Sequence, residues 1–310
     1  MSKPENISLY EFFQKFPNEE SSRVYFESQR WNGKTVCPHC GSETVSECKD
    51  HKPMPYRCKS CRKHFSVRTG TVLAESRLPL HKWMMAMYML TTARKGISSV
   101  QMAKELGVTQ KTAWFLAQRI RECWMGNDGN KGNHSGSTVE VDETFIGGKE
   151  KNKHYSKKTN AGRGTVGKVA VIGAKNRNGG VVAKPIANTK GYTLQSFIRE
   201  NVEYGATVIT DSFTGYNGLG TDFDHHSVNH SAGEYVRDQA HTNGIESFWA
   251  LLKRGHYGIY HYMSTKHLHR YVNEFSYRHN TREHGTMDFI SSTIERSVGK
   301  RIKYVDLING

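Results

Sequence analysis

Four of the six cysteines form two Cys-x-x-Cys pairs, and this pattern constrains the fold more than any other feature of the sequence. The pairs, CPHC at 37–40 and CKSC at 58–61, are separated by seventeen residues. Each pair offers two thiolates from one tight turn, and two such turns complete a tetrahedron of soft ligands that favours zinc. A segment this small has little core, so zinc should supply its folding free energy. We predict a structural zinc ribbon, with a redox pair as the alternative; the ligands are Cys37, Cys40, Cys58 and Cys61.

The chain is strongly basic. Its 310 residues include 44 Lys or Arg against 29 Asp or Glu, and the formal net charge is +15. Such a charge favours a polyanionic partner, with nucleic acid as the first choice and an anionic membrane as the second. The longest apolar run, Trp83 to Leu90, is too short to span a bilayer, and the polar N-terminus has no signal-peptide core. We therefore expect a soluble, cytoplasmic protein that does not bind membranes.

Residues 96–121, GISSVQMAKELGVTQKTAWFLAQRIR, have the pattern of a helix-turn-helix. The first helix is expected to end near residue 106, where Gly107 suits the turn, and Thr109 suits the N-cap of the second helix. The first residues of the second helix meet base edges or phosphates in helix-turn-helix proteins. An ordinary helical hairpin is the alternative. The residues that we predict to contact DNA are Gln110, Lys111 and Thr112.

Helical and strand-like patterns alternate in the rest of the chain. Aromatic and charged residues at 8–31 predict a small helical cap, and residues 126–137, GNDGNKGNHSGS, have the composition of a linker. Helical patterns occur at about 192–203 and from 242 onward. The mixture predicts an α/β or α+β architecture. The expected strands are 138–146, 165–174, 180–187 and 206–211.

The first expected strand carries three acidic residues, although acids are poor strand formers and are costly to bury. In its sequence, TVEVDETF, two valines face one way while Glu140 and Asp142 face the other. Glu143 points to the face opposite Asp142. Glu140 shares the face of Asp142 but lies a full pleat away from Asp142. An edge strand with one solvated face would explain the acids simply. A metal site at Asp142 is the alternative, and it requires partners elsewhere in the chain.

Two later acids are candidate partners of Asp142. Asp211 ends the apolar run at 206–211, and a carboxylate just past a buried strand is a frequent site position in α/β folds. Glu246 lies early in a predicted helix, and Lys253 shares its face because seven residues span two helical turns. This pair could place one carboxylate on a metal ion and one ammonium group on a neighbouring phosphate.

The motifs around these residues resemble those of the DDE transposases, and most closely bacterial insertion-sequence transposases of the ISXO-type branch, which carry an N-terminal zinc ribbon. The resemblance extends from the N-terminal region to about Arg282. Its longest phrase is the most specific part, whereas the spacing of the three acids alone would be a weak signal. The phrases are the two cysteine pairs, VEVDETFIGG, TDSFTGYNGL and HTNGIESFWALLKRGHYGIYHYMSTKHLHRYVNEFSYRHNTR.

The resemblance implies an RNase H-like catalytic domain with a mixed central sheet. It identifies Asp142, Asp211 and Glu246 as the catalytic acids, which would hold Mg²⁺ or Mn²⁺, with two ions about 3.5–4 Å apart. Three clustered carboxylates repel one another unless divalent cations neutralise them. Lys253 and Arg254 become candidates for contacts with DNA. Glu140 and Glu143 are not expected to be direct ligands.

The implied reaction has two steps. The enzyme hydrolyses a phosphodiester at each inverted-repeat end of the element, and the freed 3′-hydroxyl then attacks target DNA. The implied partner is double-stranded DNA in the bacterial nucleoid, and synapsis of two ends implies at least a homodimer. The alternative function is a sequence-specific zinc-ribbon and helix-turn-helix DNA-binding protein whose RNase H-like domain is inactive.

These inferences give a domain plan. Residues 149–168 carry seven Lys or Arg against one Glu, so this segment is either a solvated loop or a contact to the DNA backbone. The expected parts are a helical cap and zinc ribbon (1–79), the helix-turn-helix (80–125), a linker (126–137), the catalytic domain (138–290) and a C-terminal tail (291–310).

Overall fold

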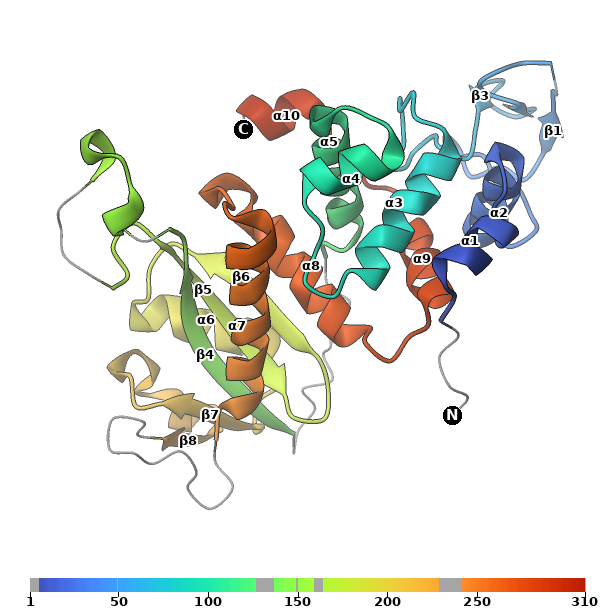
Figure 1. Ribbon diagram of the computed structural model, residues 1–310. Coiled ribbons are helices and arrows are strands. Elements are labelled where there is room, and N and C mark those ends of the chain that lie inside the picture. Colours follow the sequence, from blue (N-terminus) through green and yellow to red (C-terminus); the bar gives the residue numbers. More distant parts are fainter. Residues whose placement is uncertain are drawn as a thin grey trace. The chain divides into compact units, whose positions relative to one another are not determined.

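The computed structural model describes residues 6–48, 50–126, 137–148, 150–158, 164–228 and 241–309. The chain divides into two compact units (Figure 1). The first combines residues 1–125 with residues 283–310, and the second comprises residues 126–282. Residues 283–310, which we expected to divide between the catalytic domain and a tail, thus group with the N-terminal unit. Most of the predicted linker, residues 127–136, lies outside the described residues.

Two short helices open the first unit, as the pattern at 8–31 predicted. Helix α1 (Leu9–Lys15) begins with a capping box between Ser8 and Glu11, and helix α2 (Glu19–Trp31) begins at Asn18, whose side chain accepts a backbone hydrogen bond. The cysteine-rich segment then forms a three-stranded antiparallel sheet. Its strands are β1 (Val45–Glu47), β2 (Tyr56–Cys58) and β3 (His64–Phe65).

The predicted helix-turn-helix geometry is confirmed. Helix α4 (Ser99–Leu106) ends at Gly107, whose φ of 58° lies in the left-handed region that glycine tolerates. Helix α5 (Gln110–Cys123) begins at Thr109, whose hydroxyl accepts the backbone N–H of Thr112 at 3.2 Å. The predicted apolar stripe of α5 is buried.

Three more helices belong to this unit: α3 (Leu80–Thr92), α9 (Thr286–Arg296) and α10 (Tyr304–Asn309). Helix α3 contains the longest apolar run and buries Trp83 completely. It has 13 residues, and none of the helices in the described parts of the chain is both long and apolar enough to cross a membrane.

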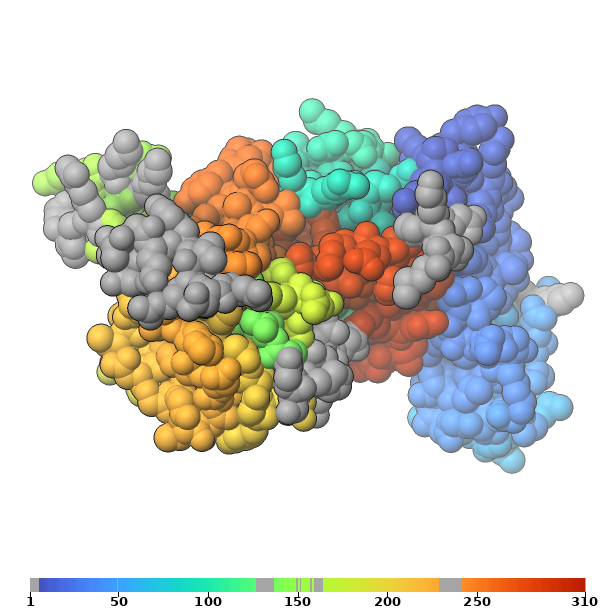
Figure 2. Space-filling view, turned by 90° about the horizontal axis from the view of Figure 1, so that it is seen from below, coloured from blue at the N-terminus to red at the C-terminus, as the bar shows by residue number. Residues whose placement is uncertain are grey.

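The second unit is built on a five-stranded mixed sheet in the order β6-β5-β4-β7-β8. Strand β5 is antiparallel to both of its neighbours, while β4, β7 and β8 are mutually parallel. This order and these directions are those of an RNase H-like sheet, which confirms the predicted fold class. The β7–β8 part of the chain, gold in Figure 2, lies at the lower left of that view. The strands are β4 (Thr138–Ile146), β5 (Val169–Asn176), β6 (Val181–Ile186), β7 (Thr207–Asp211) and β8 (Asp224–Val228).

Each face of this sheet has its own apolar core. Val139 and Val141 of β4 pack in the core that includes helix α6 (Gly191–Asn201). The other core contains residues of helices α7 (Asn243–Gly255) and α8 (Leu268–Asn280). Helices α6 and α7 lie on opposite faces of the sheet (Figure 1). The alternation of β4 therefore sends its valines toward α6 and turns Glu140 and Asp142 toward α7. A central strand, not an edge strand, carries the acids.

Candidate functional site

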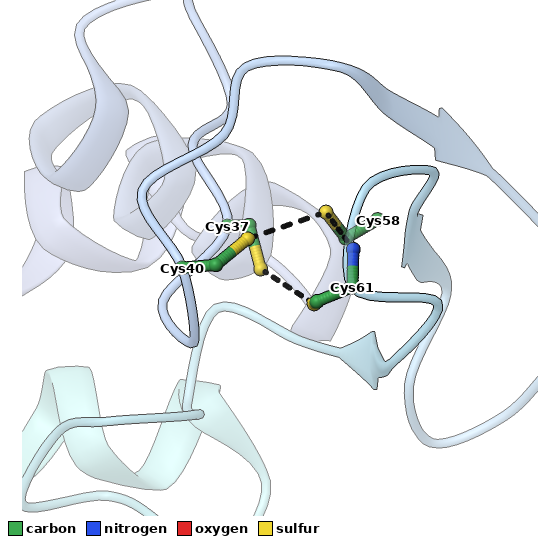
Figure 3. A group of neighbouring side chains, drawn as sticks. All are labelled: Cys37, Cys40, Cys58 and Cys61. Carbon is green, nitrogen blue, oxygen red and sulfur yellow. Dashed lines mark hydrogen bonds between the residues drawn. The ribbon is translucent and has the colours of Figure 1, made fainter.

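The four cysteines of the predicted zinc site come together in the first unit (Figure 3). Their sulfur atoms all lie within 4.8 Å of one another. The Sγ atoms of Cys37 and Cys61 are 3.7 Å apart, as are those of Cys40 and Cys58. A tetrahedron with Zn–S bonds of about 2.3 Å has edges of about 3.8 Å, so the sulfurs already have the spacing of a zinc site.

Backbone amides favour thiolates in this cluster. The N–H of His39 donates to the sulfur of Cys37 at 3.4 Å, and the N–H of Cys61 donates to that of Cys58 at 3.5 Å. The latter hydrogen bond is the largest cause that lowers the pKa of Cys58 to about 6. His39 itself is exposed, and four sulfurs complete the coordination shell without it. The donor set and its spacing therefore fit a structural zinc ion.

Two of the predicted catalytic acids lie on adjacent parallel strands of the second unit. Strands β4 and β7 pair in parallel from Thr138 with Thr207 to Glu140 with Ile209. Asp142 and Asp211 each lie two residues beyond the last of these pairs, and the charge of Asp211 contributes to the raised pKa of Asp142. Neighbouring strands are about 4.8 Å apart, so the two carboxylates emerge close together on the sheet.

Helix α7 carries the third acid, whose side chain is exposed. Glu246 lies in its first turn and accepts a hydrogen bond from the hydroxyl of Thr242 at 3.0 Å. One turn later, the indole Nε1–H of Trp249 donates to Oδ2 of Asp142 at 3.0 Å. The helix that carries Glu246 is thus attached directly to the strand that carries Asp142.

The neighbourhood of Asp142 is electrostatically unfavourable for an anion. Burial is the main cause that raises the pKa of Asp142 to about 7, and the negative charges of Glu143, Asp211 and Glu246 add to it. A divalent cation among these groups would stabilise the ionised form of Asp142. The crowding of oxygen donors therefore fits Mg²⁺ or Mn²⁺, which prefer carboxylate and water ligands.

The three acids do not converge on a single point. Among the described residues, the cysteine cluster is the only group of three or more His, Cys, Asp or Glu side chains close enough to share one ion. A two-ion site does not require such convergence, because its ions are about 3.5–4 Å apart and divide the ligands between them. The separation of the acids around Asp142 is therefore compatible with a site for two ions.

The two other acids of β4 have protein partners. Glu143 accepts a hydrogen bond from the hydroxyl of the buried Tyr216, and Glu140 is buried against the N-terminus of α7. Tyr216 and Trp249 lie in the phrases that carry the family resemblance, but no local pattern indicated that they would contact acids of β4. These contacts depend on tertiary structure.

The candidate DNA-binding residues lie at two places. Gln110 and Lys111 are exposed at the start of α5; Gln110 donates to the hydroxyl of Ser99 at 2.8 Å. The ammonium group of Lys111 lies 4.5 Å from the ring centroid of Tyr304 in α10. Thr112 is half-buried in the first turn of the helix, where its backbone N–H donates to the hydroxyl of Thr109. In the second unit, Lys253 and Arg254 occupy the last turn of α7, half-buried and exposed respectively.

Comparisons with known families agree with this division of the chain. Residues 134–280 match the ISXO2-like transposase domain, and residues 17–64 match the transposase zinc-ribbon domain. The second match overlaps the cysteine cluster, and the first contains the five-stranded sheet and the three acids. The four-cysteine cluster is accordingly the structural zinc site of a zinc ribbon.

Two relatives come from transposable elements or resemble their products. An uncharacterized protein in transposable element ISH50 of Halobacterium salinarum is 29% identical over 254 residues, which is 77% of this chain and 83% of the relative. An uncharacterized transposase-like protein of Haemophilus influenzae is 32% identical over 99 residues, which is 32% of this chain and 79% of the relative.

Solved structures of transposase complexes are more distant. The crystal structure of the Mos1 strand transfer complex shares 11% identity, with a TM-score of 0.28 over 71% of this chain and 79% of that chain. A pre-cleavage Mos1 transpososome gives a TM-score of 0.25 at the same identity, over 71% of this chain and 80% of that chain.

Proposed function

Since the chain belongs to the family of ISXO2-like transposases, we propose that it cleaves the ends of a mobile DNA element and joins the freed 3′-hydroxyl to target DNA through Asp142, Asp211 and Glu246. The observation that carries this proposal is the placement of the acids. Asp142 and Asp211 each lie two residues beyond the last pair of two adjacent parallel strands, and the helix of Glu246 is attached to Asp142 by Trp249.

Each residue of the site has its own proposed role. Asp142, with Asp211 on the neighbouring strand and Glu246 on α7, would hold the divalent cations. When bound, Mg²⁺ or Mn²⁺ would activate the attacking oxygen and stabilise the leaving oxygen. Trp249 would orient the carboxylate of Asp142 through its indole hydrogen bond. No covalent intermediate with the protein is required.

DNA would be held at several basic places. The exposed start of α5 suits the major groove, and Lys253 and Arg254 suit phosphates near the acids. Residues 149–168 are the candidate for further contacts to the DNA backbone; neutralising several of its lysines should flatten the salt dependence of binding. Two element ends must meet during the reaction, so we expect the active form to be at least a dimer on DNA.

The direct test uses the inverted repeats that flank the gene, supplied as duplex oligonucleotides with purified protein and Mg²⁺ or Mn²⁺. We expect metal-dependent cleavage by the wild type and none by Asp211→Asn. The matched control is Asp222→Asn, because Asp222 lies outside the site and pairs with Arg199 at 2.7 Å. Cleavage by Asp211→Asn at the wild-type rate would show that the site lies elsewhere.

The second candidate function is a DNA-binding protein with an inactive catalytic domain. The confirmed helix-turn-helix geometry would serve such a protein equally well. Tight and sequence-specific binding of the repeats, without cleavage under either metal, would support this function over the first.

A further inference from the structure

A buried glutamate of strand β4 caps the helix that carries Glu246. Glu140 is 1% exposed, and its Oε2 accepts the backbone N–H of Ile245, in the first turn of α7, at 2.9 Å. Thr242, at the N-cap of α7, makes no capping hydrogen bond with its side chain, and its hydroxyl donates to Glu246. Glu140 therefore supplies, from a distant strand, the acceptor and negative charge that a helix N-terminus requires.

The second oxygen of this carboxylate is also engaged. Oε1 of Glu140 lies 3.3 Å from Nε of Arg177 and 3.4 Å from Nδ1 of His241. Arg177 in turn donates through Nη2 to the backbone carbonyl of His241 at 3.3 Å. Glu140 thus joins the end of β5 to the residues that lead into α7. With both oxygens engaged, Glu140 is a structural acid on the same strand face as Asp142.

The backbone of α7 fits closely against this acid. A Cβ atom at Gly244 would lie 2.7 Å from Oε2 of Glu140 and 3.0 Å from Nζ of Lys175. The first distance is shorter than real Cβ atoms show, so a side chain at residue 244 would have to displace the Glu140 carboxylate from its hydrogen bonds. The close approach places the N–H of Ile245 within hydrogen-bonding distance.

Two hydrogen bonds hold α7 along β4. Glu140 and Asp142 are two residues apart on one strand face, which is about 6.8 Å. Their partners on the helix, Ile245 and Trp249, are four residues apart, which is a rise of about 6 Å. The two spacings agree, so the helix is fixed in one register along the strand. Glu246 immediately follows the first of these attachment points.

We propose that Glu140 is a positioning residue that fixes α7 on β4 and thereby keeps Glu246 in place for a divalent cation bound at Asp142. The proposal rests on the proposed function, because it takes Asp142 and Glu246 as ligands. Loss of the Glu140 contact would let the start of α7 shift, and the ion site would lose part of its ligand set.

The test compares Glu140→Gln and Gly244→Ala with the wild type as full-length, zinc-loaded protein. Gly244→Ala leaves Glu140 in the sequence and displaces it sterically. Gly258→Ala is the matched control, because a Cβ at Gly258 would meet nothing within 4 Å. The first measurement is the Mn²⁺ dissociation constant, from electron paramagnetic resonance of free Mn²⁺. The second is the Mg²⁺ concentration for half-maximal DNA cleavage, and thermal unfolding by circular dichroism checks folding.

We expect both site variants to weaken Mn²⁺ binding by about 10-fold and to raise the Mg²⁺ requirement similarly, while Gly258→Ala changes neither. Folded variants with the wild-type dissociation constant would overturn the proposal, even if their unfolding midpoints fell. Absence of Mn²⁺ binding by the wild type would overturn it as well. If the wild type binds Mn²⁺ but cleaves no DNA, the proposed function fails while the dissociation constants still decide the role of Glu140.

Discussion

The indole of Trp249 donates a hydrogen bond to Asp142, 107 residues earlier in the sequence, at 3.0 Å. This contact joins the first turns of α7 to the centre of the sheet, next to Asp211. The face of β4 that carries Asp142 is therefore occupied by the helix of Glu246, and the geometry of the proposed site depends on how α7 packs.

Trp249→Phe removes the donor to Asp142 and keeps most of the aromatic volume. We expect DNA cleavage to slow by about 10-fold at saturating metal, because Asp142 loses its fixed orientation. The matched control is Trp124→Phe, since the indole of Trp124 donates to Thr293 at 3.0 Å in the other unit. The control should lower stability by about 0.5–1.5 kcal/mol and leave the cleavage rate unchanged. Equal cleavage rates for Trp249→Phe and the control would contradict the orienting role.

Gly173→Ala should disturb the same contact from the neighbouring strand. Gly173 pairs with Asp142 across β4 and β5, and a Cβ there would lie 2.7 Å from the Trp249 ring. We expect a loss of about 1–3 kcal/mol in the free energy of unfolding, measured by urea denaturation, together with slower cleavage. Gly220→Ala, where a Cβ meets nothing within 4 Å, should leave both properties as in the wild type. A stable and fully active Gly173→Ala protein would show that the indole does not need this space.

Loss of one zinc ligand should unfold the ribbon and leave the second unit intact. We expect Cys58→Ser to lose its zinc, as measured by native mass spectrometry, because the ribbon has only a small core of its own. Cys48→Ser should retain one zinc ion per chain, since Cys48 lies outside the cluster. Full zinc content in Cys58→Ser would contradict the assigned ligand set.

Lys111→Ala should weaken binding to the inverted repeats. Each lysine that contacts a phosphate adds about one to the magnitude of the slope of log affinity against log salt concentration. The magnitude of this slope should therefore be smaller by about one in the variant. Fluorescence anisotropy at several salt concentrations measures the slope. Lys184→Ala is the control, because Lys184 pairs with Glu200 at 2.8 Å in the other unit. An unchanged affinity in Lys111→Ala would favour the ordinary helical hairpin.

The free energy of unfolding should fall in mild acid because His279 is buried and resists protonation in the folded state. Burial, with smaller contributions from Arg282 and Lys175, lowers the pKa of His279 to about 4. The unfolded chain binds this proton near pH 6.5, so between about pH 6.5 and 4 protonation favours the unfolded state. His279→Phe, which keeps a ring beside Phe248, should flatten the dependence of the urea midpoint on pH in this window. The same dependence in the variant would assign the acid sensitivity to other groups.

Local patterns were sufficient for features that depend on neighbouring residues. The cysteine spacing predicted the ribbon, and Gly107 and Thr109 predicted the turn and the start of the second helix of the helix-turn-helix. The alternation at Thr138–Ile146 predicted β4. Strand β8 was missed, because its sequence DHHSV has no apolar alternation and the strand lies mostly exposed at the sheet edge, where it pairs with β7. The role of Glu140 was also not predictable, since its partner Ile245 is 105 residues away.

The most direct measurement is strand joining by a pre-cleaved element end. A labelled duplex with a free 3′-hydroxyl is incubated with target plasmid, Mg²⁺ and either wild-type protein or Asp142→Asn, and a 3′-deoxy end serves as the chemical control. We expect a covalent joint for the wild type, and none for Asp142→Asn or for the 3′-deoxy end. Joining by Asp142→Asn at the wild-type rate would contradict the claim that these acids form the catalytic site.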